Sequence, residues 1–349
     1  MKQATKLYVI LTVDTEADIR NGVVIPIAKM VYGEVKGQCY GIPRIMALCE
    51  QYGYRATFFV SPFETHILGE EGMRDVCQYI QSRGHDVQLH THPKWITGQR
   101  FMWQHPYEQQ VELLGYGKAL IEQWIGERLV AHRAGGFGAS HETLRALKSV
   151  GIPVDSTHIG SPYCQLDPEK VPRNPVQVTP EGIVELPVTQ FVQFRLGPLT
   201  PKKPFDINAN TLSELQFVVR AARGAGLRVV TLLMHSFSFL KRSKDRTVFT
   251  PIPAEVKKFE RFLRFLSQQP DVEVITVKEF YQRYQRHPHL FSAPAATPLP
   301  VSGVIRSFLR ACRYVNRGRG NAVIAAAGST AGIVSLGIGG LLLWQLLRG

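Results

Sequence analysis

Three groups of acidic and histidine side chains each follow a short apolar run in this sequence. In chain order they are Asp14 with Glu16, His90 with His92, and the single His235. The apolar runs, at 7–13, 84–89 and 227–234, are rich in β-branched or aliphatic residues, which is typical of buried strands. Parallel buried strands bring the residues at their carboxyl ends to one face, where α/β barrels place their active sites. Carboxylates and imidazoles that meet there are the groups that a metal-dependent hydrolase needs.

Strand-like runs alternate with amphipathic helical patterns from residue 6 to about 285. Strands are predicted at 7–13, 55–60, 84–89, 182–188, 229–234 and 272–276, and helices at 72–83, 106–126, from 140, at 210–224, at 254–268 and from 278. This alternation predicts a mostly parallel sheet that is curved or closed into a barrel. The run at 182–188 contains a proline near its end, which indicates an edge strand.

Composition and charge narrow the function. At 349 residues the chain can form one large α/β domain or two smaller ones, and 44% apolar residues provide a sizeable core. Six arginines and no acid follow Phe291, so this tail carries six of the 13 net positive charges. A basic chain of this kind suits an anionic membrane or a phosphate-bearing substrate. Nucleic acid is not expected as a partner, because no basic helix is interleaved with aromatic residues.

The cysteines and the N-terminus both point to the cytosol. The five cysteines are odd in number and lack metal-type spacing, so reduced thiols are expected. The apolar run after Lys6 is too short for a signal peptide and leads directly into Asp14.

The sequence changes character after residue 290. Residues 1–290 are expected to form the catalytic domain, 291–303 a Pro/Ala linker, and 304–320 a basic amphipathic juxtamembrane segment. Residues 322–347 carry no charge. As a helix they would extend about 39 Å, against about 30 Å for the hydrocarbon core of a bilayer. A transmembrane helix is therefore predicted over 321–348.

The arginines around this segment predict its orientation. Five of them lie just before it and only Arg348 follows. Positive charge beside a span favours the cytoplasmic side, so a single C-terminal pass through the inner (cytoplasmic) membrane with a cytoplasmic catalytic domain is expected. Five glycines between 328 and 340 give the helix a small-residue face, which permits a homodimer.

Five motifs in register resemble those of one enzyme family. They are Thr12-Val13-Asp14, Ala56-Thr57-Phe58-Phe59-Val60, the run from Gly84 to His90, Arg133-Ala134-Gly135-Gly136, and Leu232-Leu233-Met234-His235. Over residues 6–285 the chain resembles the NodB-homology polysaccharide deacetylases (carbohydrate esterase family four). Within them it is most similar to deacetylases assigned to lipopolysaccharide biosynthesis, which carry His-x-His-Pro. The resemblance implies a distorted (β/α) barrel and a divalent metal, usually zinc, held by one carboxylate and two histidines. It also implies hydrolysis of an N-acyl, typically N-acetyl, group on a sugar.

Two positions depart from the usual motifs of this family. Thr15 stands where a second aspartate usually binds the metal, so the ligand role passes to Glu16. Lys94 stands where a second histidine is usual, four residues after His90, so His92 takes that role. Side chains at i and i+2 of extended backbone share a face, so both histidines could reach one ion. The alternative is that one of them contacts another ligand rather than the ion.

The resemblance also suggests catalytic roles. Asp14 would be the general base, and His235 the general acid that protonates the departing amine. Arg133 would orient Asp14 through a charge-assisted pair and restrain its ionisation. Asp18 is a reserve carboxylate, although its position is more typical of a solvated loop. The structural alternatives are a turn-capping role for Asp14 and a core histidine at position 235.

Four more residues are candidates for substrate contact. Asp155 could support His235 or the sugar. Trp95, Phe137 and Tyr163 could stack on a sugar ring, although surface aromatic residues are more often plain packing.

The expected function is metal-dependent N-deacetylation of an acetamido sugar in a surface glycan or a lipid-linked glycan precursor. One alternative is a deformylase or another amide hydrolase acting on a lipid-carried sugar. The other is a catalytically silent member that binds glycan or acts as a scaffold, for which the loss of the second aspartate would be the signature.

Overall fold

The computed structural model describes residues 6–20, 23–167, 174–194, 200–244, 247–293 and 299. The chain divides into two compact units, Met1–Phe191 with Lys202–Pro300, and Val192–Pro201 with Val301–Gly349. The fold given below is that of the first unit. The predicted basic segment and transmembrane helix lie outside the described residues. Within the described ranges, no helix has both the length and the apolar character needed to cross a membrane.

Within the described residues, the central sheet has nine strands. They are β1 (Leu7–Thr15), β6 (Thr57–Val60), β7 (Asp86–Thr91), β8 (Ala131–Ala134), β9 (Val154–Asp155), β10 (Gln177–Val178), β11 (Val184–Glu185), β14 (Val229–His235) and β17 (Val272–Val274). The shorter strands outside it are β2 (Asp18–Arg20), β3 (Val23–Ile25), β4 (Glu34–Val35), β5 (Gln38–Cys39), β12 (Gln190–Val192), β13 (Lys202–Pro204), β15 (Leu240–Arg242) and β16 (Phe249–Pro251).

Helices alternate with the strands of the central sheet along the chain. They are α1 (Ile27–Met30), α2 (Ile42–Glu50), α3 (Thr65–Leu68), α4 (Glu70–Ser82), α5 (Lys94–Thr97), α6 (Tyr107–Ile125), α7 (His141–Ser149), α8 (Leu212–Gly224), α9 (Pro253–Ser267) and α10 (Val277–Arg286). Short 3-10 turns are η1 (Met102–Gln104), η2 (Gly135–Phe137) and η3 (Pro288–Phe291).

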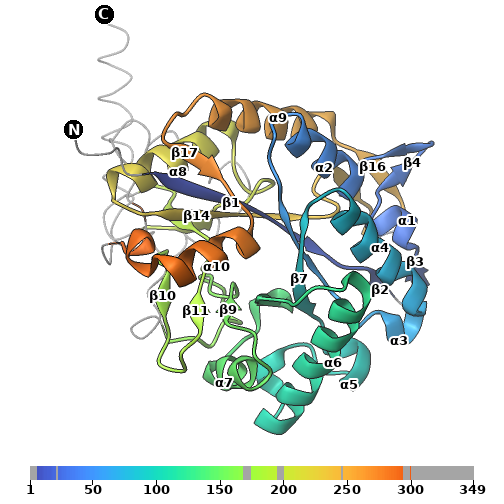
Figure 1. Cartoon of the computed structure of the whole chain (residues 1–349). Coiled ribbons are helices and arrows are strands. Elements are labelled where there is room, and N and C mark those ends of the chain that lie inside the picture. The colour runs from blue at the N-terminus through green and yellow to red at the C-terminus, as the bar shows by residue number, and fades with distance from the viewer. Residues whose placement is uncertain are drawn as a thin grey trace, which may run out of the picture. The chain divides into compact units, whose positions relative to one another are not determined.

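The strand order is β10-β11-β9-β8-β7-β6-β1-β14, with β17 also paired to β1. Figure 1 shows β14 and β17 beside β1 and, lower in the view, β10, β11 and β9. All of these pairs except β10–β11 are parallel where register is defined, as the alternation of elements predicts. The segment after β11 connects the two ends of this curled sheet, because Leu186 N–H donates to Asp155 O (2.7 Å) and Thr189 N–H to Thr231 O (3.3 Å). Loop backbone thus replaces strand pairing at the closure, which makes the barrel a distorted one.

The prediction of an edge strand at 182–188 is wrong. Strand β11 contains only Val184 and Glu185, and it lies between β9 and β10. Pro187 has no N–H to donate to a ladder, so regular pairing stops before it. The actual edge is β10, a two-residue strand whose sequence carries too little pattern to be recognised.

Successive side chains of β1 point to opposite faces of the sheet, an outer face toward the helices and an inner face toward the interior of the barrel. Val9, Leu11 and Val13 pack in the larger core with the helices, whereas Ile10 packs in a second cluster with Phe59. Asp14 follows Ile10 at even spacing and therefore faces the inner side.

Helix α10 covers the amino-terminal end of the inner space. The Val277 N–H donates to Thr57 Oγ1 (2.8 Å) at the start of β6, and the Lys278 N–H donates to Asp86 Oδ2 (3.1 Å) at the start of β7. The polar residues that follow the strands are at the other end.

Candidate active site

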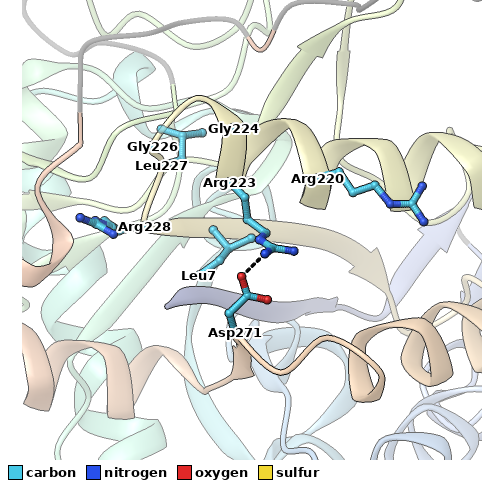
Figure 2. Close-up of a pocket in the computed structure, with 8 residues that line it drawn as sticks. All are labelled: Leu7, Arg220, Arg223, Gly224, Gly226, Leu227, Arg228 and Asp271. Atoms are coloured by element: carbon cyan, nitrogen blue, oxygen red, sulfur yellow. Dashed lines mark ion pairs between the residues drawn. The ribbon is translucent and has the colours of Figure 1, made fainter. Parts of the chain in front are cut away.

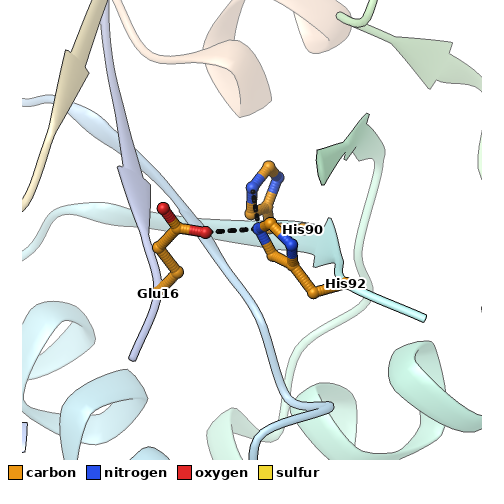
Figure 3. A group of neighbouring side chains, drawn as sticks. All are labelled: Glu16, His90 and His92. Atoms are coloured by element: carbon orange, nitrogen blue, oxygen red, sulfur yellow. Dashed lines mark hydrogen bonds and ion pairs between the residues drawn. The ribbon is translucent and has the colours of Figure 1, made fainter. Parts of the chain in front are cut away.

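Glu16, His90 and His92 converge where β1 and β7 end, and their side chains point toward one another (Figure 3). One potential ligand atom of each lies within 4.8 Å of the other two. His90 Nε2 and His92 Nε2 are 3.1 Å apart, and the Glu16 carboxylate forms an ion pair with His92 Nε2. One carboxylate and two imidazole nitrogens form a donor set that suits zinc and leaves an open coordination position.

A backbone carbonyl fixes the orientation of His90. A carbonyl can only accept, so His90 Nδ1 donates to Arg133 O (2.7 Å) and Nε2 keeps its lone pair for the cluster. Burial lowers the pKa of His90 to about 4, although the charges of Asp14 and Glu16 oppose this effect. The side chain is therefore held as the neutral imidazole that binds a metal.

Glu16 and His92 hold each other in their charged forms. Burial disfavours the Glu16 carboxylate, but the charge of His92 outweighs this effect and lowers the pKa of Glu16 far below its usual value. Burial also lowers the pKa of His92, and here Glu16 reverses the effect and raises it. A divalent cation would replace the proton of this pair.

The Arg133 side chain is fully buried and donates four hydrogen bonds. Its Nη1 donates to Asp14 Oδ1 (2.7 Å) and to Thr12 Oγ1 (3.0 Å). Its Nε donates to Ser156 O (3.0 Å) and its Nη2 to Ser156 Oγ (2.9 Å), while the guanidinium carbon lies 4.3 Å from the Phe59 ring centroid. The structure thus contains the pair predicted between Arg133 and Asp14, and its geometry fixes the direction of the carboxylate.

Asp14 and His235 are neighbours across the β1–β14 pairing, where their Cα atoms are register partners. Burial raises the pKa of Asp14, but the charges of Arg133, His90 and His235 outweigh this, and the net pKa is lowered. The His235 ring stacks on Phe237 at 5.0 Å and is partly exposed. An ionised carboxylate and an accessible imidazole therefore stand side by side at the edge of the Glu16–His90–His92 cluster.

Asp155 lies beside His132 in the sheet. Its carboxylate is fully buried, and its Oδ1 lies 2.8 Å from His132 Nδ1 and accepts a 2.9 Å bond from Thr157 Oγ1. The other nitrogen of His132 lies 3.0 Å from Thr91 Oγ1. Asp155 therefore supports His132 within the sheet, and its expected role toward His235 or the sugar stays a prediction.

Asp18 also differs from its expected setting. It is 4% exposed in β2 and lies 3.9 Å from Lys94 Nζ, so it is not a solvated loop residue. Lys94 Nζ in turn lies 4.0 Å from the Trp95 ring centroid. Lys94 thus covers one face of Trp95, the tryptophan proposed for sugar stacking.

The remaining aromatic candidates belong to two packing groups. Phe137 has a positive φ of 60° and packs beside Ile159. Tyr163, 44% exposed, stacks on Phe101 with 4.9 Å between ring centroids. Trp103 stacks on the same Phe101 at 5.6 Å. Sequence reasoning missed Phe101 and Trp103, for which the aromatic run after the second histidine motif is the only signal.

Gly135 connects the turn after β8 with the ligand cluster. A Cβ built on Gly135 would lie 2.7 Å from His92 Nδ1 and 2.5 Å from Thr91 O. The absence of a side chain here allows the backbone to lie directly against the His92 ring.

A hollow of about 450 Å³ lies at the opposite ends of the strands, beside the starts of β1 and β14 (Figure 2). Leu7 and Arg228 line it, and Arg223 forms an ion pair with Asp271 across it. None of the candidate site residues lines this hollow. It is therefore separate from the cluster at the carboxyl ends.

Comparisons with known proteins identify the fold. No family model and no curated protein matches the sequence. A solved structure from Mycobacterium smegmatis, assigned as a polysaccharide deacetylase, aligns with a TM-score of 0.54 and 16% identity over 87% of this chain and 96% of that one. At this identity the likeness shows the fold alone, and this fold is the distorted barrel expected from the sequence.

Two further solved structures are more distant. The Xyl-CE4 domain of a multidomain xylanase from the hindgut metagenome of Trinervitermes trinervoides has a TM-score of 0.42 and 14% identity over 80% of this chain and 92% of that one. Peptidoglycan deacetylase PdaC from Bacillus subtilis has a TM-score of 0.40 and 12% identity, and the alignment covers 82% of this chain and 97% of that one. These similarities are too weak to add to the fold assignment.

Proposed function

We propose that this chain is a metal-dependent N-deacetylase of an acetamido sugar and a member of the NodB-homology polysaccharide deacetylases. The observation that carries the proposal is the convergence of Glu16, His90 and His92 beside Asp14, itself held by the buried Arg133. The fold shared with the Mycobacterium smegmatis protein supports it.

The residues of the site divide the work of amide hydrolysis. A divalent cation, for which the donor set favours zinc, would be held by Glu16, His90 and His92 and would polarise the amide carbonyl and the attacking water. Asp14, ionised and oriented by Arg133, accepts a proton from that water. His235 donates a proton to the departing nitrogen, so the products are acetate and the free amine of the sugar.

The test is product release from matched substrates. The purified protein is incubated with zinc and with nucleotide-linked and lipid-linked sugars that carry either an acetamido or a formamido group. Acetate release that is lost in Asp14→Asn supports the proposal. Formate release alone would identify a deformylase, and no release from any of these substrates would favour a glycan-binding or scaffold member.

We further propose that the substrate is a lipid-linked glycan precursor at the cytoplasmic face of the inner membrane. The support is in the sequence, where the uncharged residues 322–347 follow five closely spaced arginines. A helix there would anchor the catalytic domain, residues 1–290, through the linker 291–303. A translocation-dependent reporter should be silent at the N-terminus and active at the C-terminus. The reverse pattern would make a finished surface glycan the substrate.

A further inference from the structure

Glu64 is a buried acid that forms no ion pair within the described residues. Its side chain is 1% exposed, and neither carboxyl oxygen accepts a hydrogen bond of ordinary geometry within the described ranges, although the Ser61 side chain is close enough to stabilise the carboxylate. It is the residue before α3, yet its side chain does not cap that helix. Burying a carboxyl group without a partner is unfavourable. Another charged group is therefore expected to interact with it.

Other buried acids in the described part of the chain are at least partly paired. Asp14 accepts from Arg133, and Glu185 Oε1 accepts from the His158 N–H (3.0 Å). Glu181, which has one buried oxygen without a partner, uses the other to pair with His141 Nδ1 at 2.7 Å. Of the described acids, only Glu64 has two buried oxygens that both lack a partner.

The segment that carries Glu64 lies beside the segments that carry two of the candidate metal ligands, Glu16 and His92. The Ser61 N–H donates to Thr15 O (3.1 Å), which places the connection between β6 and α3 beside Glu16. Helix α3 also packs against α5, which begins two residues after His92. Burial raises the pKa of Glu64 to about 7; the charge of His92, the Ser61 side chain and the backbone of Glu64 oppose this effect, and the charge of Glu16 increases it.

Charge balance indicates what Glu64 does at this position. A divalent cation on Glu16 and two neutral imidazoles leaves one net positive charge, and Asp14 is already neutralised by Arg133. We propose that Glu64 is a carboxylate beside the metal centre whose negative charge neutralises the remaining positive charge of the bound cation. This inference rests on the metal site of the proposed function, but it concerns a residue that no motif includes.

Glu64→Gln tests the inference, because glutamine keeps the shape of the side chain and removes its charge. Zinc affinity is measured by competition with a chromophoric chelator, and thermal unfolding is measured with and without zinc. We expect zinc affinity to fall by about 10–100-fold, the range found when groups around a metal site are removed. The rise in melting temperature on adding zinc should shrink accordingly. The metal-free variant should be as stable as the wild type or more stable, because an unpaired buried acid is gone.

Glu181→Gln is the matched control, since it also alters an acid with a buried unpaired oxygen but one that pairs with His141. It should leave zinc affinity unchanged. Equal zinc affinity in Glu64→Gln and wild type would overturn the role of Glu64, and a loss of metal-free stability would then show that the residue is structural. Absence of zinc binding by the wild type would instead overturn the metal centre, and this inference with it.

Discussion

The buried pair of Arg133 and Asp14 gives a quantitative prediction about how the base is held. Arg133→Met keeps much of the side-chain volume but removes the 2.7 Å donor from Asp14, which is only 3% exposed. Removing one partner of a buried ion pair costs about 3–5 kcal/mol, because the other charge is left uncompensated. We expect Arg133→Met to lower the free energy of unfolding by that amount.

The double variant separates the pair from the other contacts of Arg133. Asp14→Asn also destabilises, since it leaves the fully buried guanidinium without its counter-charge. The double variant carries neither charge. The decreases in the free energy of unfolding of the two single variants should therefore add up to about 2–3 kcal/mol more than the decrease measured for the double variant. The contacts of Arg133 with Ser156 are lost in both proteins that carry Arg133→Met, and they cancel from this difference.

The assay is urea unfolding of the four metal-free proteins, followed by circular dichroism. Arg145→Met, which breaks an exposed pair with Glu142, serves as control and should change the free energy of unfolding by less than about 1 kcal/mol. Additive effects of Arg133→Met and Asp14→Asn would show that the two charges do not stabilise each other. Arg133 would then not be the group that keeps Asp14 ionised and oriented.

Three further predictions concern the acid, the ligands and pH. His235→Ala should lower kcat by about 10² or more with the fold retained, and near wild-type turnover would remove its assignment as general acid. At limiting zinc, His92→Ala should reduce metal occupancy and Lys94→Ala should not, as measured by elemental analysis; full occupancy in His92→Ala would exclude His92 from the ligands. Burial lowers the pKa of His85 from 6.5 to about 4, although Glu50 opposes this effect. Between these two pH values His85 is protonated in the unfolded chain but remains neutral in the native state. Stability should therefore fall between pH 6.5 and 4, by at most about 3 kcal/mol, and His85→Gln should flatten this slope in urea titrations at several pH values; equal slopes would contradict the assignment.

The sequence predicts which polar residues come together, because each of them lies at or just after the end of a strand. β1 and β14 are nearly continuous apolar runs, whereas β7 has only Val87 and Leu89 before its first histidine. A parallel sheet brings the carboxyl ends of such strands to one face whatever their order. Glu16, His90 and His235 follow from this pattern alone. Arg133 required the family resemblance, since a buried arginine has no signature of its own in a single sequence.

Features that depend on contacts between distant segments could not be predicted. The pairing of Asp155 with His132 depends on the register of β8 against β9. The burial of Asp18 requires the β2–β3 pairing, whose three-residue strands carry little pattern. Glu64 is exceptional only because it is buried without a partner, and burial is a property of the packed fold.

Metal reconstitution tests the central claim most directly. The protein is stripped with a chelator, and acetate release from an acetamido sugar that the untreated protein cleaves is followed as zinc is added back in fractions of an equivalent. We predict that release is absent at first, rises in proportion to zinc and reaches its plateau at one equivalent per chain. Release that persists in the metal-free protein, or that remains absent at full zinc occupancy, would contradict a metal-dependent deacetylase built on Glu16, His90 and His92.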